Sequence, residues 1–70
     1  MSLIRIFGRN VRAIRLAKGW TQEQLAFEAG VKRAYISEIE SGKRNPSLDV
    51  VERLANALEV GPEELVRTTN

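Results

Sequence analysis

The 70-residue chain carries 11 basic and 9 acidic side chains, a net charge of +2, and neither cysteine nor histidine. Without those two residue types it has no disulfide, no thiolate or imidazole metal site and no histidine general base, so we expect no metal, no cofactor and no enzyme. No stretch approaches the ~18 apolar residues of a membrane span, and we expect a cytoplasmic protein without a membrane partner. A chain of this length folds as one domain, which we place at residues 1–70.

The charges are unevenly distributed along the chain. Residues 1–20 contain four arginines and one lysine but no acid, whereas residues 47–70 contain five acids and two arginines. This asymmetry predicts a basic face that binds a polyanion and an acidic end with a different use. An ordinary solvated charged surface is the alternative interpretation.

The first predicted helix covers residues 3–18. At about 100° per residue, its apolar side chains gather on one face and Arg5, Arg9 and Arg12 on the other. The apolar face consists of Leu3, Phe7, Val11 and Ile14. Gly19 suits the left-handed end of this helix, and we interpret Trp20 as a plug between helices rather than a residue that stacks on a base.

The next two helices, residues 22–29 and 32–41, are joined by a short turn at Gly30. Thr21 and Gln24 have the spacing of a capping box at the start of the first helix. Small Ala26 allows a close crossing, and Gly30 supplies the backbone conformation of a sharp turn. The inward-facing residues are Leu25 and Ala26 on the first helix and Ile36 and Ile39 on the second. Together these features predict a helix-turn-helix over residues 22–41, with an ordinary helical hairpin as the alternative.

Two further helices are expected at residues 48–58 and 62–67. Ser47 can cap the first of them, and the pair Gly61-Pro62 separates the two, with proline in a first-turn position. The stripe expected to face the core consists of Leu48, Val51, Leu54, Ala55 and Leu58. Because β-branched residues never alternate over a run, no strand competes. The sequence therefore predicts an all-α fold, a compact bundle of five helices.

The helix predicted at residues 32–41 has an outward face as well as a buried one. That face consists of Arg33, Ala34, Ser37, Glu38 and Ser41, and Lys32 lies beside its first turn. A helix of this kind fits the major groove of DNA with its N-terminal residues at the base edges. The basic pair at the start of the helix thus stands where the helix meets DNA.

From about Val11 to Leu58 the sequence resembles the Cro/C1-type (XRE) helix-turn-helix family, whose typical domain is a five-helix, lambda-repressor-like bundle. The segment RAYISEIESGKRNPSL is similar to the same segment of small restriction–modification controller proteins. The usual pattern there is Arg-Thr-Tyr-Ile-Ser, then Ile-Glu-Arg-Gly, then Arg-Asn. This chain has Ala34 in place of the threonine and Ser41 in place of the arginine.

The resemblance implies roles for individual residues. Arg33 would contact guanine, Ala34 a thymine methyl group and Ser37 either a donor or an acceptor. Glu38 would accept a hydrogen bond from cytosine N4, or else would only repel phosphates or orient Arg33. The implied phosphate contacts are Gln22, Lys32, Tyr35, Lys43, Arg44 and Asn45, with a merely solvated loop as the alternative for the last three. Arg15 and Glu40 resemble an internal ion pair of the family.

The resemblance also implies a homodimer, because one recognition helix contacts too few base pairs for useful specificity. Val60, Leu65 and Val66 are the candidate dimer interface, and closure of the monomer core is the alternative. We therefore expect a transcription regulator that binds a short pseudo-palindromic double-stranded DNA operator, as a restriction–modification controller or autoregulator. RNA polymerase is a further candidate partner, and no small-molecule ligand is expected. The competing hypothesis is an antitoxin-type interaction module that also binds DNA, for which Thr68-Thr69-Asn70 leave little tail.

Overall fold

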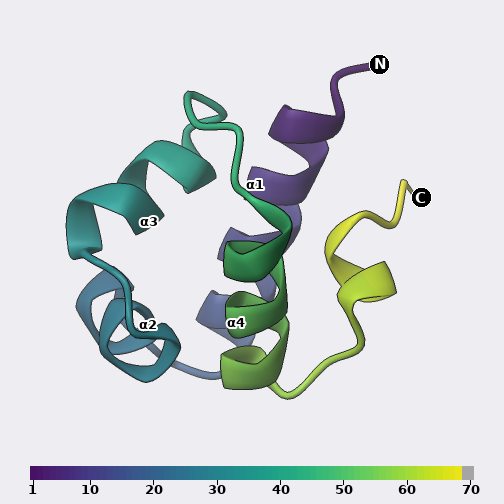
Figure 1. The fold of residues 1–70 in the computed structure, drawn as a ribbon. Coiled ribbons are helices and arrows are strands. Elements are labelled where there is room, and N and C mark those ends of the chain that lie inside the picture. The colour runs from purple at the N-terminus through teal and green to yellow at the C-terminus, as the bar shows by residue number, and fades with distance from the viewer. Residues whose placement is uncertain (69–70) are drawn as a thin grey trace.

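The computed structural model describes residues 1–68, so the last two residues of the predicted domain and of its short tail lie outside the described range. The elements are α1 (Leu3–Ala17), α2 (Gln22–Ala29), α3 (Arg33–Glu40), α4 (Leu48–Leu58) and the 3₁₀-helix η1 (Pro62–Leu65). No strand occurs among the described residues, which agrees with the all-α prediction. Figure 1 shows α2 and α3 on one side of α4 and the C-terminal segment on the other. None of the described helices is long and apolar enough to cross a membrane.

The prediction of a fifth helix at residues 62–67 is wrong. The segment forms only one 3₁₀ turn over Pro62–Leu65, because four residues cannot offset the cost of nucleating an α-helix. Helix α4 is capped at its end by Glu59, a left-handed residue with φ of 60°, and Gly61 stands in extended conformation before Pro62. The molecule therefore has four α-helices and a short tight turn in its described part.

The turn and caps of the predicted helix-turn-helix are confirmed. Gly30 ends α2 in the left-handed conformation, with φ of 71°. The Thr21 hydroxyl accepts from the Gln24 N–H at 3.1 Å, and the Gln24 side chain accepts from the Thr21 N–H at 2.7 Å. The Ser47 hydroxyl caps α4 by accepting from the Val50 N–H at 3.2 Å. Local chemistry thus defines where α2 begins and ends and where α4 begins.

The core lies where the four helices meet, and six of its large side chains are completely buried. These are Val11, Leu25, Ile36, Ile39, Leu54 and Leu65. Two leucines predicted to face the core are instead on the surface: Leu3 is 53% exposed and Leu48 is 86% exposed. Each is the first residue of its helix, beyond the neighbouring helices that cover the rest of the apolar face. Trp20 packs against the core as predicted, with the Lys18 ammonium 4.7 Å from its ring centre.

Helix α1 crosses α3 at Gly8, which is buried. A Cβ atom added to Gly8 would overlap the carbonyl oxygen of Ile39 and lie 3.3 Å from the Cα of Glu40. The two backbones can approach this closely only because residue 8 has no side chain. Gly8 therefore fixes the position of α1 relative to the C-terminal end of α3.

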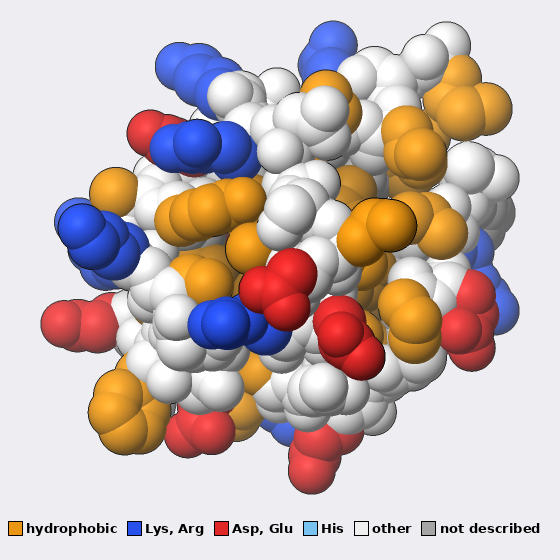
Figure 2. Space-filling model, viewed as in Figure 1, with side chains coloured by type: hydrophobic (Ala, Val, Ile, Leu, Met, Phe, Trp, Pro, Cys, Tyr) orange, Lys and Arg blue, Asp and Glu red, His pale blue; other side chains and the backbone are white. Residues whose placement is uncertain are grey.

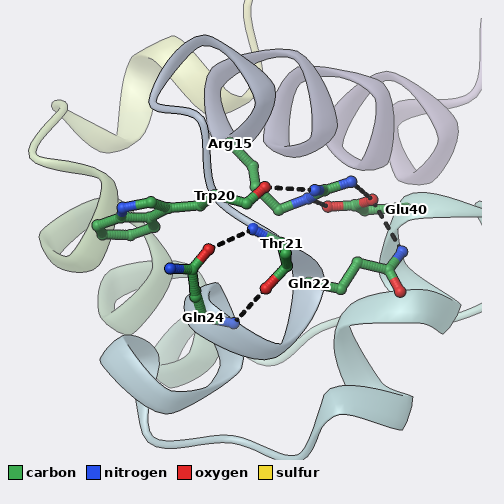
Figure 3. Close-up of polar contacts among 6 residues, drawn as sticks. All are labelled: Arg15, Trp20, Thr21, Gln22, Gln24 and Glu40. Atoms are coloured by element: carbon green, nitrogen blue, oxygen red, sulfur yellow. Dashed lines mark hydrogen bonds and ion pairs between the residues drawn. The ribbon is translucent and has the colours of Figure 1, made fainter.

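The predicted Arg15–Glu40 ion pair is present and joins three parts of the fold (Figure 3). The two side chains are 8% and 3% exposed, and two parallel hydrogen bonds link them, from Nε to Oε2 at 2.7 Å and from Nη2 to Oε1 at 2.9 Å. Arg15 Nη1 also donates to the Trp20 carbonyl at 2.7 Å, and Gln22 Nε2 donates to Glu40 Oε1 at 3.1 Å. The pair thus connects α1 to the start of α2 and the end of α3.

The hydrogen bond and the charge of Glu40 raise the pKa of Arg15 above its usual value, although burial opposes the shift. The guanidinium consequently keeps its charge throughout the pH range in which the protein is folded. Among the described residues, every buried side-chain nitrogen and oxygen has a hydrogen-bond partner. The buried charges are therefore fully satisfied, as such a pair requires.

The first prediction concerns the crossing at Gly8. Alanine is a better helix former than glycine by about 1 kcal/mol, so propensity alone would stabilise a Gly8→Ala variant. Because the added methyl group overlaps the α3 backbone, we expect the variant to lose about 1–3 kcal/mol of stability instead. Thermal unfolding followed by circular dichroism measures the sign of this change. A higher melting temperature than that of the native chain would contradict the close crossing.

The second prediction concerns the buried ion pair. Glu40→Leu leaves the Arg15 charge buried without its carboxylate, and we expect a loss of about 3–5 kcal/mol in urea unfolding. The matched control is the double variant Arg15→Met with Glu40→Leu, which removes both charges and keeps the volume. It should recover most of the loss, since apolar replacement of a whole pair is often neutral. A single variant as stable as the native chain would show that the pair has no such role.

Candidate nucleic-acid interface

The two faces of α3 have opposite environments. Ile36 and Ile39 are completely buried where α3 packs against α1 and α2, and they hold the helix in one rotational orientation. Three of the four predicted base-contacting residues, Arg33, Ala34 and Ser37, are exposed on the other face. Arg33 is the first residue of α3, and Lys32 directly precedes it. The structure therefore presents the N-terminal half of this face to solvent.

The fourth predicted base-contacting residue, Glu38, is held by the loop that follows α3. Its Oε1 atom accepts from Arg44 Nη2 at 2.6 Å and from Arg44 Nε at 2.9 Å. The Arg44 guanidinium also stacks on Tyr35, 4.7 Å from the ring centre. Glu38 is thus paired with Arg44, and the described residues show no hydrogen bond or ion pair between Glu38 and Arg33. Two of the predicted phosphate contacts, Tyr35 and Arg44, lie together as a result.

The other predicted phosphate contacts surround α3. Gln22 is the first residue of α2, and its side-chain amide donates to the buried Glu40. Lys43 and Asn45 are exposed in the loop between α3 and α4. The start of this loop is shaped by left-handed Gly42, with φ of 76°, and by a hydrogen bond from the Lys43 N–H to the Glu38 carbonyl at 2.9 Å. Lys43 thus directly follows the turn that ends α3, whereas Asn45 borders an apolar groove beside Pro46 and Leu48.

Positive surface charge gathers near α3 and the loop that follows it. Figure 2 shows Lys and Arg side chains along the upper left edge, over α3 and the following loop, and acidic side chains mainly across the centre and lower half. Lys32, Arg33 and Lys43 form no ion pair with any carboxylate in the described residues. Their charge is therefore available to a polyanion that approaches α3.

One of the predicted dimer residues lies in the core. Leu65 is completely buried by the chain's own residues, so its assignment to the dimer interface is wrong and the alternative, closure of the monomer core, holds for it. The Asn10 side chain fixes this segment by donating to the carbonyls of Leu65 and Arg67, both at 3.0 Å. Val60 packs partly against the core, whereas Val66 is 39% exposed.

An exposed apolar groove lies beside Val66, and the sequence pattern did not reveal it. It has a volume of about 210 Å³ and is bordered by residues from the start of α1, the loop before α4, α4 itself and the C-terminal segment. The apolar residues of this groove are Leu3, Ile4, Phe7, Pro46, Leu48, Val51 and Val66. Helical periodicity missed it because the pattern assigns Leu3 and Leu48 to the core and contains no signal for the edge of a neighbouring helix.

Comparisons with known proteins agree with this geometry. Residues 11–65 match the helix-turn-helix family HTH_3. The control protein C.BamHI of Bacillus amyloliquefaciens is 51% identical over 65 residues, which cover 91% of this chain and 80% of the relative. An uncharacterised HTH-type transcriptional regulator of Sinorhizobium fredii, y4dJ, is 37% identical over the whole chain and 91% of its own length.

A solved structure shares the fold as well as the sequence. The restriction–modification controller protein C.AhdI from Aeromonas hydrophila superimposes with a TM-score of 0.86 and 45% identity, over 89% of this chain and 94% of that one. The family match covers both helices of the helix-turn-helix, the whole of α4 and the core apart from Phe7. The chain therefore belongs to the helix-turn-helix family of Cro/C1 (XRE) type, a family of DNA-binding transcription regulators.

Proposed function

We propose that this regulator binds a short pseudo-palindromic operator as a homodimer, with α3 in the major groove, and acts as a restriction–modification controller or on its own promoter. The observation that carries the proposal is the division of α3 into a face locked by Ile36 and Ile39 and an exposed face that begins with Arg33. The similarity to two controller proteins, C.BamHI and C.AhdI, supports the biological role.

In this proposal Arg33 is the main base contact. Its planar guanidinium matches O6 and N7 of guanine, a bidentate contact worth about 1–3 kcal/mol of discrimination. Ala34 lies beside it and offers a methyl group to thymine, and Ser37 one turn later can donate or accept. All three side chains are exposed and contribute nothing to the core, so they are free to meet base edges.

Glu38 has two functions in this proposal. Both of its contacts with Arg44 use Oε1, which leaves Oε2 able to accept from cytosine N4. At the same time the carboxylate and the Tyr35 ring hold the Arg44 guanidinium in place for a phosphate. Together with Gln22, Lys32, Lys43 and Asn45, Arg44 supplies affinity and salt dependence rather than choice of sequence.

The groove between α1 and α4 is our candidate for the dimer surface, with Val66, which lines it, retained from the sequence-based prediction; Val60 does not line the groove and stays a predicted interface residue. Recognition helices in successive major grooves are about 34–36 Å apart, so each lies about 17 Å from the two-fold axis. The chain measures 29 Å in its longest dimension, and we place its partner on the side away from α3, which keeps α3 at a distance from the axis. Figure 2, drawn in the view of Figure 1, shows hydrophobic side chains gathered on the right-hand side, where Figure 1 has the start of α1 and the C-terminal segment.

A second copy of the chain is the occupant that this surface fits. An apolar groove flanked by exposed Leu3 and Leu48 can be self-complementary, since in a two-fold dimer the leucines of each protomer lie against the groove of the other. The acidic side chains of η1, Glu63 and Glu64, would then remain far from the DNA. This arrangement accounts for the charge asymmetry of the sequence.

The base-contact assignment is tested by selection of bound duplexes from random DNA, followed by titration with the native chain and Arg33→Ala. We expect a two-fold-symmetric site in which the preference for one guanine relaxes in the variant, with a loss of about 1–3 kcal/mol at that position. Lys43→Ala is the matched control, since it should weaken all sequences alike and reduce the salt dependence. If Arg33→Ala weakened all sequences equally, the base-contact assignment would be incorrect.

The dimer surface is tested with Leu48→Glu. Glutamate is favourable in the first turn of α4, so the fold should be retained while the exposed apolar surface gains a charge. In sedimentation equilibrium we expect the dimer dissociation constant to rise at least about tenfold, or about 1.4 kcal/mol. The matched control is Phe27→Glu, which places a charge on a side chain that is 83% exposed and does not line the groove. Equal dimerisation of the native and Leu48→Glu chains would place the interface elsewhere.

A further inference from the structure

Three arginines form a basic stripe on the exposed side of α1. They belong neither to the proposed base contacts nor to the proposed phosphate contacts. Arg5, Arg9 and Arg12 are spaced four and three residues apart, so they project from one face of the helix. With Glu40, Ser41 and Gly42 they line a cleft of about 390 Å³ between α1 and the end of α3. The basic stripe therefore borders the recognition helix at its C-terminal end.

Two glycines fix the basic stripe relative to α3. Gly8 brings the α1 backbone against Ile39, as described above. A Cβ atom added to Gly42 would lie 3.0 Å from Cγ of Arg5, so the stem of this arginine packs against the turn that ends α3. Gly42 is followed directly by Lys43, a predicted phosphate contact. The stripe is thus a rigid continuation of the basic loop after the recognition helix.

The charge of the basic stripe is not neutralised within the described part of the chain. Five of the 11 basic residues pair with carboxylates, namely Arg15, Lys18, Arg44, Arg53 and Arg67. The three stripe arginines form no such pair with any carboxylate in residues 1–68. Glu40, the acid that lines the cleft, is already bound by Arg15 and Gln22. The cleft therefore carries an uncompensated positive charge.

The same arrangement opposes the local stability of α1. Like charges three and four residues apart repel by a few tenths of a kcal/mol per pair. The first turn of α1 contains no acidic residue, and Arg5 lies close to the positive end of the helix dipole. Sequences tolerate such local conflicts mainly at functional sites. A bound anion would remove the conflict.

We propose that the basic stripe binds phosphates of the operator backbone in addition to those contacted by the residues around α3. The proposal rests on the proposed DNA-binding function and extends it by a second backbone-binding surface. From Arg5 to Arg12 the helix rises about 10.5 Å, and one DNA strand presents about three phosphates over that axial distance. Guanidinium groups bind phosphate oxygens in bidentate fashion without regard to base sequence.

The test compares two triple variants on a duplex selected from random DNA by the native chain. One variant combines Arg5→Gln, Arg9→Gln and Arg12→Gln. The charge-matched control combines Lys18→Gln, Arg53→Gln and Arg67→Gln, which removes three charges that are paired with carboxylates elsewhere. Both remove three positive charges from a chain of net charge +2. Circular dichroism verifies that both variants are folded, and binding is titrated across a salt series.

A plot of log affinity against log salt has a negative slope. We expect this slope to become shallower in the stripe variant by about 0.9 for each arginine that contacts a phosphate, while the sequence preference stays that of the native chain. The control should keep the native slope, and ethylation interference should show that the stripe variant alone loses a group of phosphates. Equal slopes for the native chain and the stripe variant, or equal losses in both variants, would overturn the proposal and leave the proposed function intact. If the native chain selected no duplex, the proposed function would fail, and the stripe proposal with it.

Discussion

The buried pair of Arg15 and Glu40 is the interaction on which the rest of the molecule depends. It lies where α1, the start of α2 and the end of α3 come together, and it also holds the Trp20 carbonyl and the Gln22 amide. A pair of this kind contributes little net stability, because desolvation of two charges offsets their attraction. Its value is directional: two parallel hydrogen bonds in fixed geometry reinforce the orientation of α3 that Ile36 and Ile39 set by apolar packing.

The close crossing at Gly8 complements this pair. The pair fixes how α3 is oriented, and the glycine fixes how near α1 approaches it. Together they form a rigid platform whose exposed side carries unpaired cations from α1, α3 and the following loop. A single structural unit of three helices thus unites the proposed base contacts and the proposed backbone contacts, although these come from distant parts of the sequence. Such rigidity lowers the entropic cost of association with a regular duplex.

Much of this fold could be predicted from local chemistry. The capping box at Thr21, the left-handed Gly30 and the cap at Ser47 act within a few residues, and the structure confirms all three. The mistakes concern tertiary surroundings. Periodicity placed Leu3 and Leu48 inside because it cannot tell where a neighbouring helix ends. A fifth α-helix was expected after Gly61, yet Leu65 reaches the core from a single 3₁₀ turn.

In the candidate site, too, local features could be predicted and contacts between distant segments could not. The exposed positions of Arg33, Ala34 and Ser37 could be predicted from the helical period, because the isoleucines on the opposite face of the same helix were identifiable as core residues. The link between Glu38 and Arg44 depends on the path of a loop, which no period describes. Likewise, the role of Gly8 exists only because of a backbone carbonyl 31 residues away in sequence, at Ile39. Contacts between distant segments were therefore the part of the site that sequence patterns left out.

The two-faced construction of α3 has a consequence for how such a regulator can change over evolution. Residues 33, 34 and 37 lie outside the core, so their replacement costs little in folding free energy, and with the proposed base contacts it alters the preferred operator. New specificity is then accessible one position at a time, without compensating changes in the interior. Glu38 is the exception, because its replacement also releases Arg44 and shifts the loop contact. Divergence among copies of this domain should therefore be rapid at the first three positions and slower at the fourth, where two interactions would have to change together.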